Sequence, residues 1–97
     1  MTTFFGLPLA TVPGEVMTPR RASEQLVRLA AERIGDSPAR VADVGTGSGA
    51  IAVALALAAP KAQIWATDIS AASVLLARAN AYRLGVGDRV HVEARFA

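Results

Sequence analysis

The sequence predicts one small α/β domain, in which strands and helices alternate along the chain and the strands form a parallel sheet. Residues 41–51 give an apolar strand, a turn with glycine at alternate positions and the start of a helix. Two further strand-like segments, residues 63–68 and 89–93, each follow a helical pattern. The order strand, helix, strand, helix, strand predicts right-handed crossovers, with the third strand lying beyond the second.

The composition limits the class of protein. A chain of 97 residues buries only about 60 to 65% of its unfolded surface, so we expect marginal stability. The hydrophobic fraction of 53% excludes general intrinsic disorder. The sequence has no cysteine, which excludes disulfides and thiolate metal sites and fits a cytoplasmic protein. The first residues do not form a secretory signal, and no apolar stretch is long enough to span a bilayer. A net charge of +2 is only weak support for a nucleic-acid partner.

A small hairpin is expected at the N-terminus, within a lead-in segment over residues 1–36. Residues 4–12 are the first expected strand, and Pro8 marks it as an edge strand. The turn is expected at Pro13 and Gly14, because this pair suits a turn with glycine at a positive φ. Residues 15–17 are the expected second strand.

A helix is expected after this hairpin and before Gly35. It begins at residues 18–19, where a threonine can cap and a proline is tolerated, with Ser23 as a competing cap one turn later. It ends at Ile34, because Gly35 is a natural stop. Its apolar face is expected to comprise Leu26, Leu29, Ala30 and Ile34.

The remaining elements follow in order. Residues 40–44 form the first strand of the sheet, and residues 49–59 form a helix that is small and apolar on every side. Such a helix cannot face solvent, so we expect it to pack against the sheet and a further element. After residues 63–67, Ser70 caps a helix that continues through Leu84. The apolar positions of this helix are Val74, Leu75, Ala77 and Ala81.

The turn after the first strand has the pattern of a ligand-binding loop. Glycines at 45, 47 and 49 permit unusual torsions and leave space for a ligand, and their amides at a helix start are candidate donors. Gly45, Gly47 and Ala50 also satisfy the dinucleotide fingerprint. The glycines alone therefore do not distinguish nicotinamide from other nucleoside ligands.

Asp43 favours a ligand without phosphate. Unit charges ~4 Å apart interact by roughly 4 kcal/mol at an effective dielectric of about 20, so a carboxylate here would repel a diphosphate and attract a cation. S-adenosylmethionine carries a sulfonium and an ammonium, and no phosphate. The alternative is that Asp43 only hydrogen-bonds the amides of the loop.

Asp68 stands at the interval expected for a ribose-binding acid. It follows Gly49 by nineteen residues, close to the roughly twenty at which a carboxylate binds ribose hydroxyls in this architecture. Its alternative role is to cap the helix that starts near Ser70. Both roles can coexist, because a carboxylate has two oxygens.

Four segments, residues 5–7, 17–20, 43–52 and 66–70, resemble the catalytic domain of the methyltransferases that modify a glutamine of peptide chain release factors. The resemblance implies a Rossmann-like class I S-adenosylmethionine fold, with a parallel sheet and helices on both faces, preceded by a hairpin and a helix. Residues 37–97 would be the N-terminal half of an incomplete cofactor-binding domain. The glycines would contact the methionine part, Asp43 the amino group and Asp68 the ribose. The implied cofactor-binding residues are Asp43, Gly45, Thr46, Gly47, Gly49, Asp68 and Ile69.

The sequence departs from this family at three places. Residues 21–23 replace the usual proline, acid and threonine, and residues 94–97 offer no acid beside the adenine. The Asn-Pro-Pro-Tyr motif that holds the acceptor amide in this family is absent from the sequence. We therefore assign no catalytic residue and expect the chain alone to be inactive, since an oriented acceptor supplies most of the rate.

The expected function is that of the cofactor-binding part of a methyltransferase that acts on the glutamine amide of a release factor, its protein partner. One alternative is a non-catalytic, truncated nucleoside-binding module. A second is an N-methyltransferase for an exocyclic amine of RNA or DNA. A nicotinamide-dependent dehydrogenase is disfavoured by Asp43 and Gly49.

The chain is also expected to self-associate or to need a missing C-terminal half. In the family fold, residues 40–44 lie in the middle of the sheet, so an uncovered edge on this strand would recruit another strand. The apolar helix over residues 49–59 favours the same outcome. Val41 and Val44 are expected at the contact.

Overall fold

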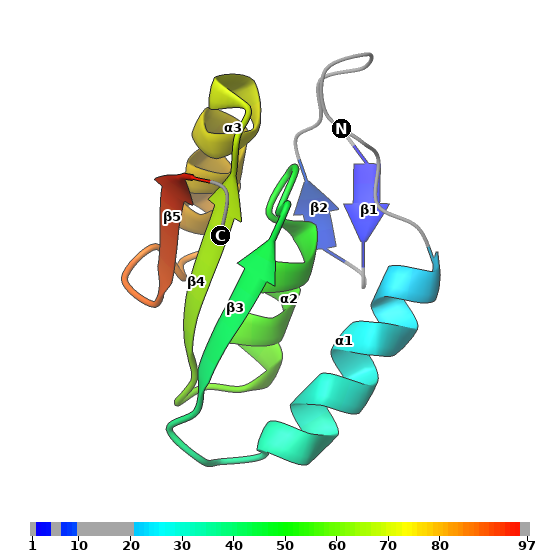
Figure 1. Cartoon of the computed structure of the whole chain (residues 1–97). Coiled ribbons are helices and arrows are strands. Elements are labelled where there is room, and N and C mark those ends of the chain that lie inside the picture. Colours follow the sequence, from blue (N-terminus) through cyan, green and yellow to red (C-terminus); the bar gives the residue numbers. More distant parts are fainter. Residues whose placement is uncertain (1, 5–6, 10–20, 96–97) are drawn as a thin grey trace.

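The computed structural model of the chain describes residues 2–4, 7–9 and 21–95, and it contains an N-terminal hairpin and a three-stranded sheet with helices (Figure 1). The hairpin consists of β1 (Thr2–Phe4) and β2 (Leu7–Leu9). The sheet and its helices are, in chain order, α1 (Arg21–Ile34), β3 (Arg40–Val44), α2 (Ala50–Ala58), β4 (Gln63–Asp68), α3 (Ala71–Arg83) and β5 (Val90–Ala94). None of the described helices is both long and apolar enough to cross a membrane.

The sheet has the predicted order and direction. Its strand order is β3-β4-β5 and both pairs are parallel. Val41 of β3 is opposite Ile64 of β4, which is opposite Val90 of β5. Parallel neighbours need a crossover, which α2 and α3 supply. The prediction of a parallel sheet, with the third strand beyond the second, is confirmed.

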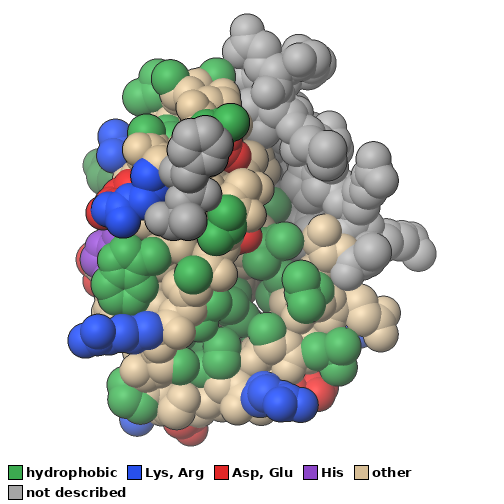
Figure 2. Space-filling view, in the orientation of Figure 1, with side chains coloured by type: hydrophobic (Ala, Val, Ile, Leu, Met, Phe, Trp, Pro, Cys, Tyr) green, Lys and Arg blue, Asp and Glu red, His purple; other side chains and the backbone are tan. Residues whose placement is uncertain are grey.

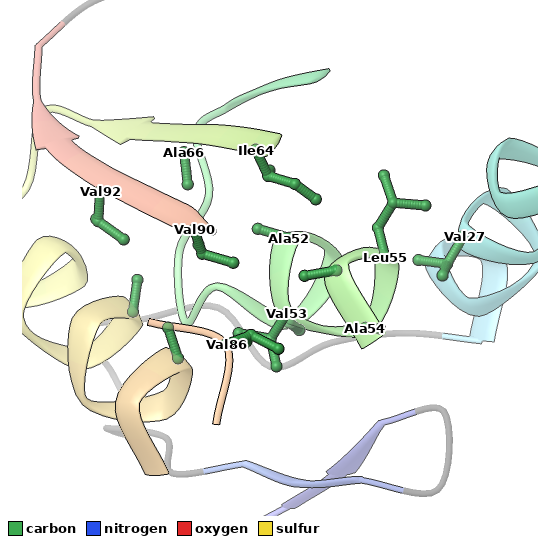
Figure 3. Packing of buried hydrophobic residues seen from close by; sticks show 14 of the residues in the cluster. Val27, Ala52, Val53, Ala54, Leu55, Ile64, Ala66, Val86, Val90 and Val92 are labelled. Atoms are coloured by element: carbon green, nitrogen blue, oxygen red, sulfur yellow. The ribbon is translucent and has the colours of Figure 1, made fainter. Parts of the chain in front are cut away.

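The hydrophobic core lies between one face of this sheet and the helices (Figure 3). Alternate strand residues, among them Ile64 and Val90, point toward α2 and α3. On the other flank of α2, Val27 of α1 lies beside Leu55 (Figure 3). Six of the nine residues of α2 are buried, because the helix contacts the sheet, α1 and α3. This confirms the prediction that an all-apolar helix has more than one partner.

The C-terminus of α2 is held by one guanidinium group. Arg89, just before β5, donates from Nη2 to the Ala56 carbonyl at 2.7 Å and from Nη1 to the carbonyls of Ala59 and Ala62 at 3.2 and 3.1 Å. The last carbonyls of a helix lack intrahelical partners and carry partial negative charge. Arg89 therefore fastens α2 to the beginning of β5.

The described helices cover one face of the sheet, whereas helices on both faces were expected. The crossovers from β3 to β4 and from β4 to β5 run in the same direction across the sheet. Because successive crossovers have the same handedness, their helices α2 and α3 lie on the same side of the sheet. The opposite face carries hydrophobic, basic and histidine side chains side by side (Figure 2). There the Trp65 and His91 rings lie 4.9 Å apart, and the Arg40 guanidinium lies 6.0 Å from the Trp65 ring.

The two edges of the sheet differ. On β5, the Arg78 side chain donates from Nε and Nη2 to the Val92 carbonyl, at 3.3 and 2.8 Å. On β3, strand pairing involves only β4 within the described residues, and Val44 is exposed. Val41, by contrast, packs against the core. Of the two residues expected at a self-association contact, Val44 is exposed and Val41 is half-buried, and the contact itself stays a prediction.

The hairpin differs from its expected position. The strands β1 and β2 pair antiparallel, with Phe4 opposite Leu7, so residues 5–6 connect them. The prediction of one continuous strand over residues 4–12 was wrong, because β1 ends at Phe4 and β2 spans only Leu7–Leu9. Pro8 does lie in a two-stranded sheet, opposite Thr3. The expected turn at 13–14 and strand at 15–17 lie outside the described residues.

The helix α1 ends at Ile34 as predicted, and Ala30 and Ile34 of its predicted apolar face pack against the core, but the two leucines of that face do not. Leu26 and Leu29 are 56% and 58% exposed, whereas Val27 is fully buried. Packing against the alanine-rich α2 favours small residues, which allow two helices to approach closely. Ser23 lies inside the helix and does not cap it, and residues 18–20 lie outside the described part. The residues that pack against the core are Val27, Ala30, Ala31 and Ile34.

The helix α3 begins as predicted. Ser70 is its N-cap and accepts a hydrogen bond from the Ser73 amide, with a nitrogen–oxygen distance of 3.3 Å. Leu75 was predicted in the apolar face but is exposed. The other predicted apolar positions, Val74, Ala77 and Ala81, are buried.

Candidate functional site

The predicted site residues meet at the carboxyl ends of β3 and β4. Val44 is opposite Thr67 in the parallel register, so the strand-end residues Asp43 and Asp68 come close together. The glycine loop, residues 45–49, leaves β3 at this point and leads into α2 (Figure 1). In parallel sheets this edge is where ligands bind. The structure therefore brings together side chains that are 25 residues apart in sequence.

The loop needs glycine for its backbone torsions. Gly45, Gly47 and Gly49 have φ values of 73°, 57° and 80°, all in the left-handed region. A side chain at these torsions is strained. Apart from its chain neighbours, no atom of the described residues would lie within 4 Å of a Cβ on Gly45, so this position borders open space in the described part of the chain.

Four amides of the loop, those of residues 45–47 and 49, are already bonded within the chain, which corrects the expectation that they are ready donors for a ligand. The Gly45 and Thr46 amides both donate to the Thr67 carbonyl, at 2.8 and 2.9 Å. The Gly47 amide donates to Oδ2 of Asp68 at 3.0 Å, and the Gly49 amide donates to the Thr46 carbonyl at 2.9 Å. A phosphate cradle depends on amides that point at the ligand. This loop presents a compact backbone surface instead.

Asp43 is held by the residues that follow it. Its Oδ2 accepts a hydrogen bond from Oγ1 of Thr46 at 2.8 Å. Burial raises the pKa of Asp43, the bonds from the Thr46 hydroxyl and the Ala52 amide lower it, and the charge of Asp68 raises it, with a net increase. Ionisation of Asp43 is therefore harder than that of a solvent-exposed aspartate, and a cationic group beside it would stabilise the ionised form.

Asp68 uses both carboxylate oxygens inside the protein. Oδ1 accepts from the Ser70 amide at 2.9 Å, and Oδ2 accepts from the Gly47 amide at 3.0 Å. It thereby joins the start of α3 to the glycine loop, while Ser70 provides the side-chain cap. Each carboxylate oxygen has a second lone pair, so Asp68 can still accept from a ribose diol. The adjacent Ile69 is 69% exposed and offers apolar surface at the same edge.

One residue of the site was missed in the sequence. Asn80 of α3 is fully buried, and its Nδ2 donates to the Ser48 carbonyl of the loop at 2.8 Å. The sequence did contain a signal for it. Asn80 precedes Ala81 directly and follows Ala77 by one helical turn, so it is a polar residue on the predicted apolar face of the helix. A buried amide needs partners, but periodicity does not say where they are.

Comparison with known proteins places the chain among methyltransferases. The family described as methyltransferase small domain matches residues 21–95. Release factor glutamine methyltransferase of Gloeobacter violaceus is 49% identical over 78 residues, which are 79% of this chain and 27% of that protein. The Bordetella pertussis protein of the same description is 48% identical over 83 residues, 84% of this chain and 30% of that protein. The chain thus spans less than a third of the length of these relatives.

Solved structures support the same fold. Ribosomal protein L11 methylase from Lactobacillus delbrueckii subsp. bulgaricus has a TM-score of 0.68 and 36% identity, covering 86% of this chain and 42% of that one. An RNA methyltransferase from Salinibacter ruber, in complex with S-adenosyl-L-homocysteine, has a TM-score of 0.69 and 29% identity. That alignment covers 82% of this chain and 50% of the other.

Proposed function

The chain belongs to the methyltransferase small domain family, and we propose that the carboxyl ends of β3 and β4 bind S-adenosylmethionine as the methyl donor of a methyltransferase. The observation that carries the proposal is a glycine loop that lies between two carboxylates and has four of its five amides bonded within the chain. Such a site has carboxylates for a cation and few free amides for a phosphate. S-adenosylmethionine fits it because it carries a sulfonium and an ammonium and has no phosphate.

Each residue of the site has a separate proposed role. Asp43 receives the amino group of the methionine part, and Thr46 orients this carboxylate through its hydroxyl. Asp68 receives the ribose hydroxyls, and Ile69 provides apolar surface for the adenine. The backbone at Gly45, Gly47 and Gly49 forms the surface against which the methionine part lies. The bound cofactor supplies an electrophilic methyl group.

The proposed acceptor is the side-chain amide of a glutamine in a peptide chain release factor. This is supported by relatives described as release factor glutamine methyltransferases, with identities of 49% and 48%. An exocyclic amine of RNA is the second candidate, because the similar RNA methyltransferase structure is 29% identical. The first is preferred for its higher identity. The proposed location is the cytoplasm, where release factors act.

Calorimetric titration with S-adenosylhomocysteine and with NAD tests the proposed cofactor. We expect tighter binding of S-adenosylhomocysteine, and weakening by about 1 to 3 kcal/mol in Asp68→Ala, because a charged hydrogen-bond partner is lost. Asp36→Ala is the matched control, since it removes the same charge at the loop before β3, at the opposite end of that strand (Figure 1). A clear preference for NAD would reject the proposed cofactor.

Binding of the cofactor-loaded chain to a release factor and to an RNA hairpin distinguishes the two acceptors. Tighter binding of the release factor is expected, and tighter binding of the RNA would favour the second candidate.

A further inference from the structure

The glycine loop is attached to α3 through three consecutive residues. The Gly47 amide bonds to Asp68, whose other oxygen bonds to the Ser70 amide at the start of that helix. The next two residues, Ser48 and Gly49, contact the body of the helix. Elements far apart in the chain thus determine where this part of the loop lies.

Ser48 is fixed by the buried amide of Asn80. Nδ2 of Asn80 lies 2.8 Å from the Ser48 carbonyl oxygen, and both residues are buried. Oδ1 of Asn80 accepts from Nη2 of Arg83 at 3.0 Å. A guanidinium only donates, so it holds the carbonyl end of the amide and leaves the NH2 end toward the loop. The first helical bond of α2 uses the Gly49 carbonyl, so Asn80 bonds the carbonyl just outside that helix.

Gly49 is fixed by steric contact with the same face of α3. A Cβ atom on Gly49 would lie 3.0 Å from Cβ and 3.1 Å from Cα of Ala77. Ala77 is fully buried and precedes Asn80 by three residues, so the two lie on one helix face. The loop therefore lies directly against the backbone of α3, and the small size of both residues permits this approach.

We propose that Asn80 is a positioning residue for cofactor binding, which acts through Ser48 and Gly49, with Ala77 as the surface that limits the approach of the loop. The proposal rests on the proposed function. Asn80 is fully buried and touches the loop, so its effect on the ligand is indirect. A loop held in its binding conformation before the ligand arrives spends less binding free energy on ordering.

The test measures cofactor affinity and unfolding stability separately in the 97-residue chain. Asn80→Asp keeps the size of the side chain and its acceptor for Arg83, but it places a carboxylate oxygen against the Ser48 carbonyl oxygen. Asn80→Ser is the second variant, because its hydroxyl can donate but is too short to span the same distance. Val27→Ala is the matched control, a truncation of a fully buried residue on α1. All variants are compared under conditions in which each is largely folded, as judged by urea unfolding.

Calorimetry with S-adenosylhomocysteine should give a dissociation constant about tenfold higher for Asn80→Asp, as expected for a lost buried hydrogen bond. Asn80→Ser should show a smaller loss, and Val27→Ala should bind like the wild type although its stability also falls. In the unliganded chain, the Gly47 and Gly49 amide signals in a ¹H–¹⁵N spectrum should move in both Asn80 variants and stay in place in Val27→Ala.

Unchanged affinity in both Asn80 variants, with unchanged Gly47 and Gly49 signals, would overturn the positioning role and leave Asn80 as a stabilising residue only. If the wild type itself does not bind S-adenosylhomocysteine, the proposed function fails. The amide signals of the unliganded chain then still decide the positioning role, because they need no ligand.

Discussion

Replacing Gly49 by alanine should destabilise the chain through two separate effects. Gly49 is the N-cap of α2 and has a φ of 80°, a torsion that an L-residue adopts only with strain. The added Cβ would also lie 3.0 Å from Cβ and 3.1 Å from Cα of Ala77. The second atom belongs to the backbone of α3, so the contact cannot be relieved by a side-chain rotation.

The two effects have different magnitudes. A left-handed torsion costs about 1 to 2 kcal/mol for an L-residue. An additional carbon in a well-packed interior costs about 1 to 3 kcal/mol. Their sum, roughly 2 to 5 kcal/mol, is a large share of the about 5 to 15 kcal/mol that stabilises a typical domain.

Gly85→Ala separates the two effects. Gly85 has a φ of 79°, but among the described residues only its chain neighbours lie within 4 Å of a Cβ there, so this variant carries only the torsional cost. Urea unfolding with linear extrapolation gives both free energies. The loss at Gly49 should exceed the loss at Gly85 by about 1 to 3 kcal/mol. Equal losses would refute the close approach of α3 to the loop.

Three further changes test other parts of the structure. Burial raises the pKa of Asp43, so the folded chain holds this proton more tightly than the unfolded chain. The resulting stability is present below about pH 4 and is lost as the pH rises through the raised pKa. The unfolding free energy of the wild type should therefore fall relative to that of Asp43→Asn over this range. A rise of the wild type relative to this variant would contradict the raised pKa. Arg89→Met should cost about 1.5 to 3 kcal/mol in urea unfolding, since charged hydrogen bonds to the end of α2 are lost, whereas Arg89→Lys should recover only part of it; full stability of Arg89→Met would contradict this account. Within the described residues one edge of β3 has no strand partner, and we propose that this edge makes the chain self-associate or need a further segment. Sedimentation at low micromolar concentration should therefore detect oligomers that Val44→Lys reduces, and a strictly monomeric wild type would contradict this proposal.

The prediction of the fold succeeded where one physical cause determined the outcome. A helix that is apolar on every side, like α2, has to be buried. The carboxyl ends of two adjacent parallel strands lie at the same edge of the sheet, and this brings Asp43 and Asp68 together. The face of α1 was predicted correctly at Ala30 and Ile34. It was wrong at its leucines, because Leu26 and Val27 are both apolar and only the packing against α2 decides which of them is buried.

The finer features of the site could not be predicted because their partners lie far away in the sequence. Three amides of the loop bond to Thr67 and Asp68, which follow the loop by about twenty residues, and the sequence pattern does not encode these bonds. Asn80 bonds to a backbone carbonyl 32 residues earlier. Backbone partners of this kind leave no side-chain signal.

The central claim is that the space beside the glycine loop holds S-adenosylmethionine, and Gly45→Ala tests it most directly. Gly45 has a φ of 73°, and a Cβ there would enter space that is open among the described residues, as it would at Gly85. Both alanine variants should therefore lose about 1 to 2 kcal/mol of stability from the torsion. Calorimetry with S-adenosylhomocysteine should give a markedly weaker affinity for Gly45→Ala alone, because only that methyl group would occupy the ligand space. An affinity of Gly45→Ala equal to that of Gly85→Ala would contradict the proposed site.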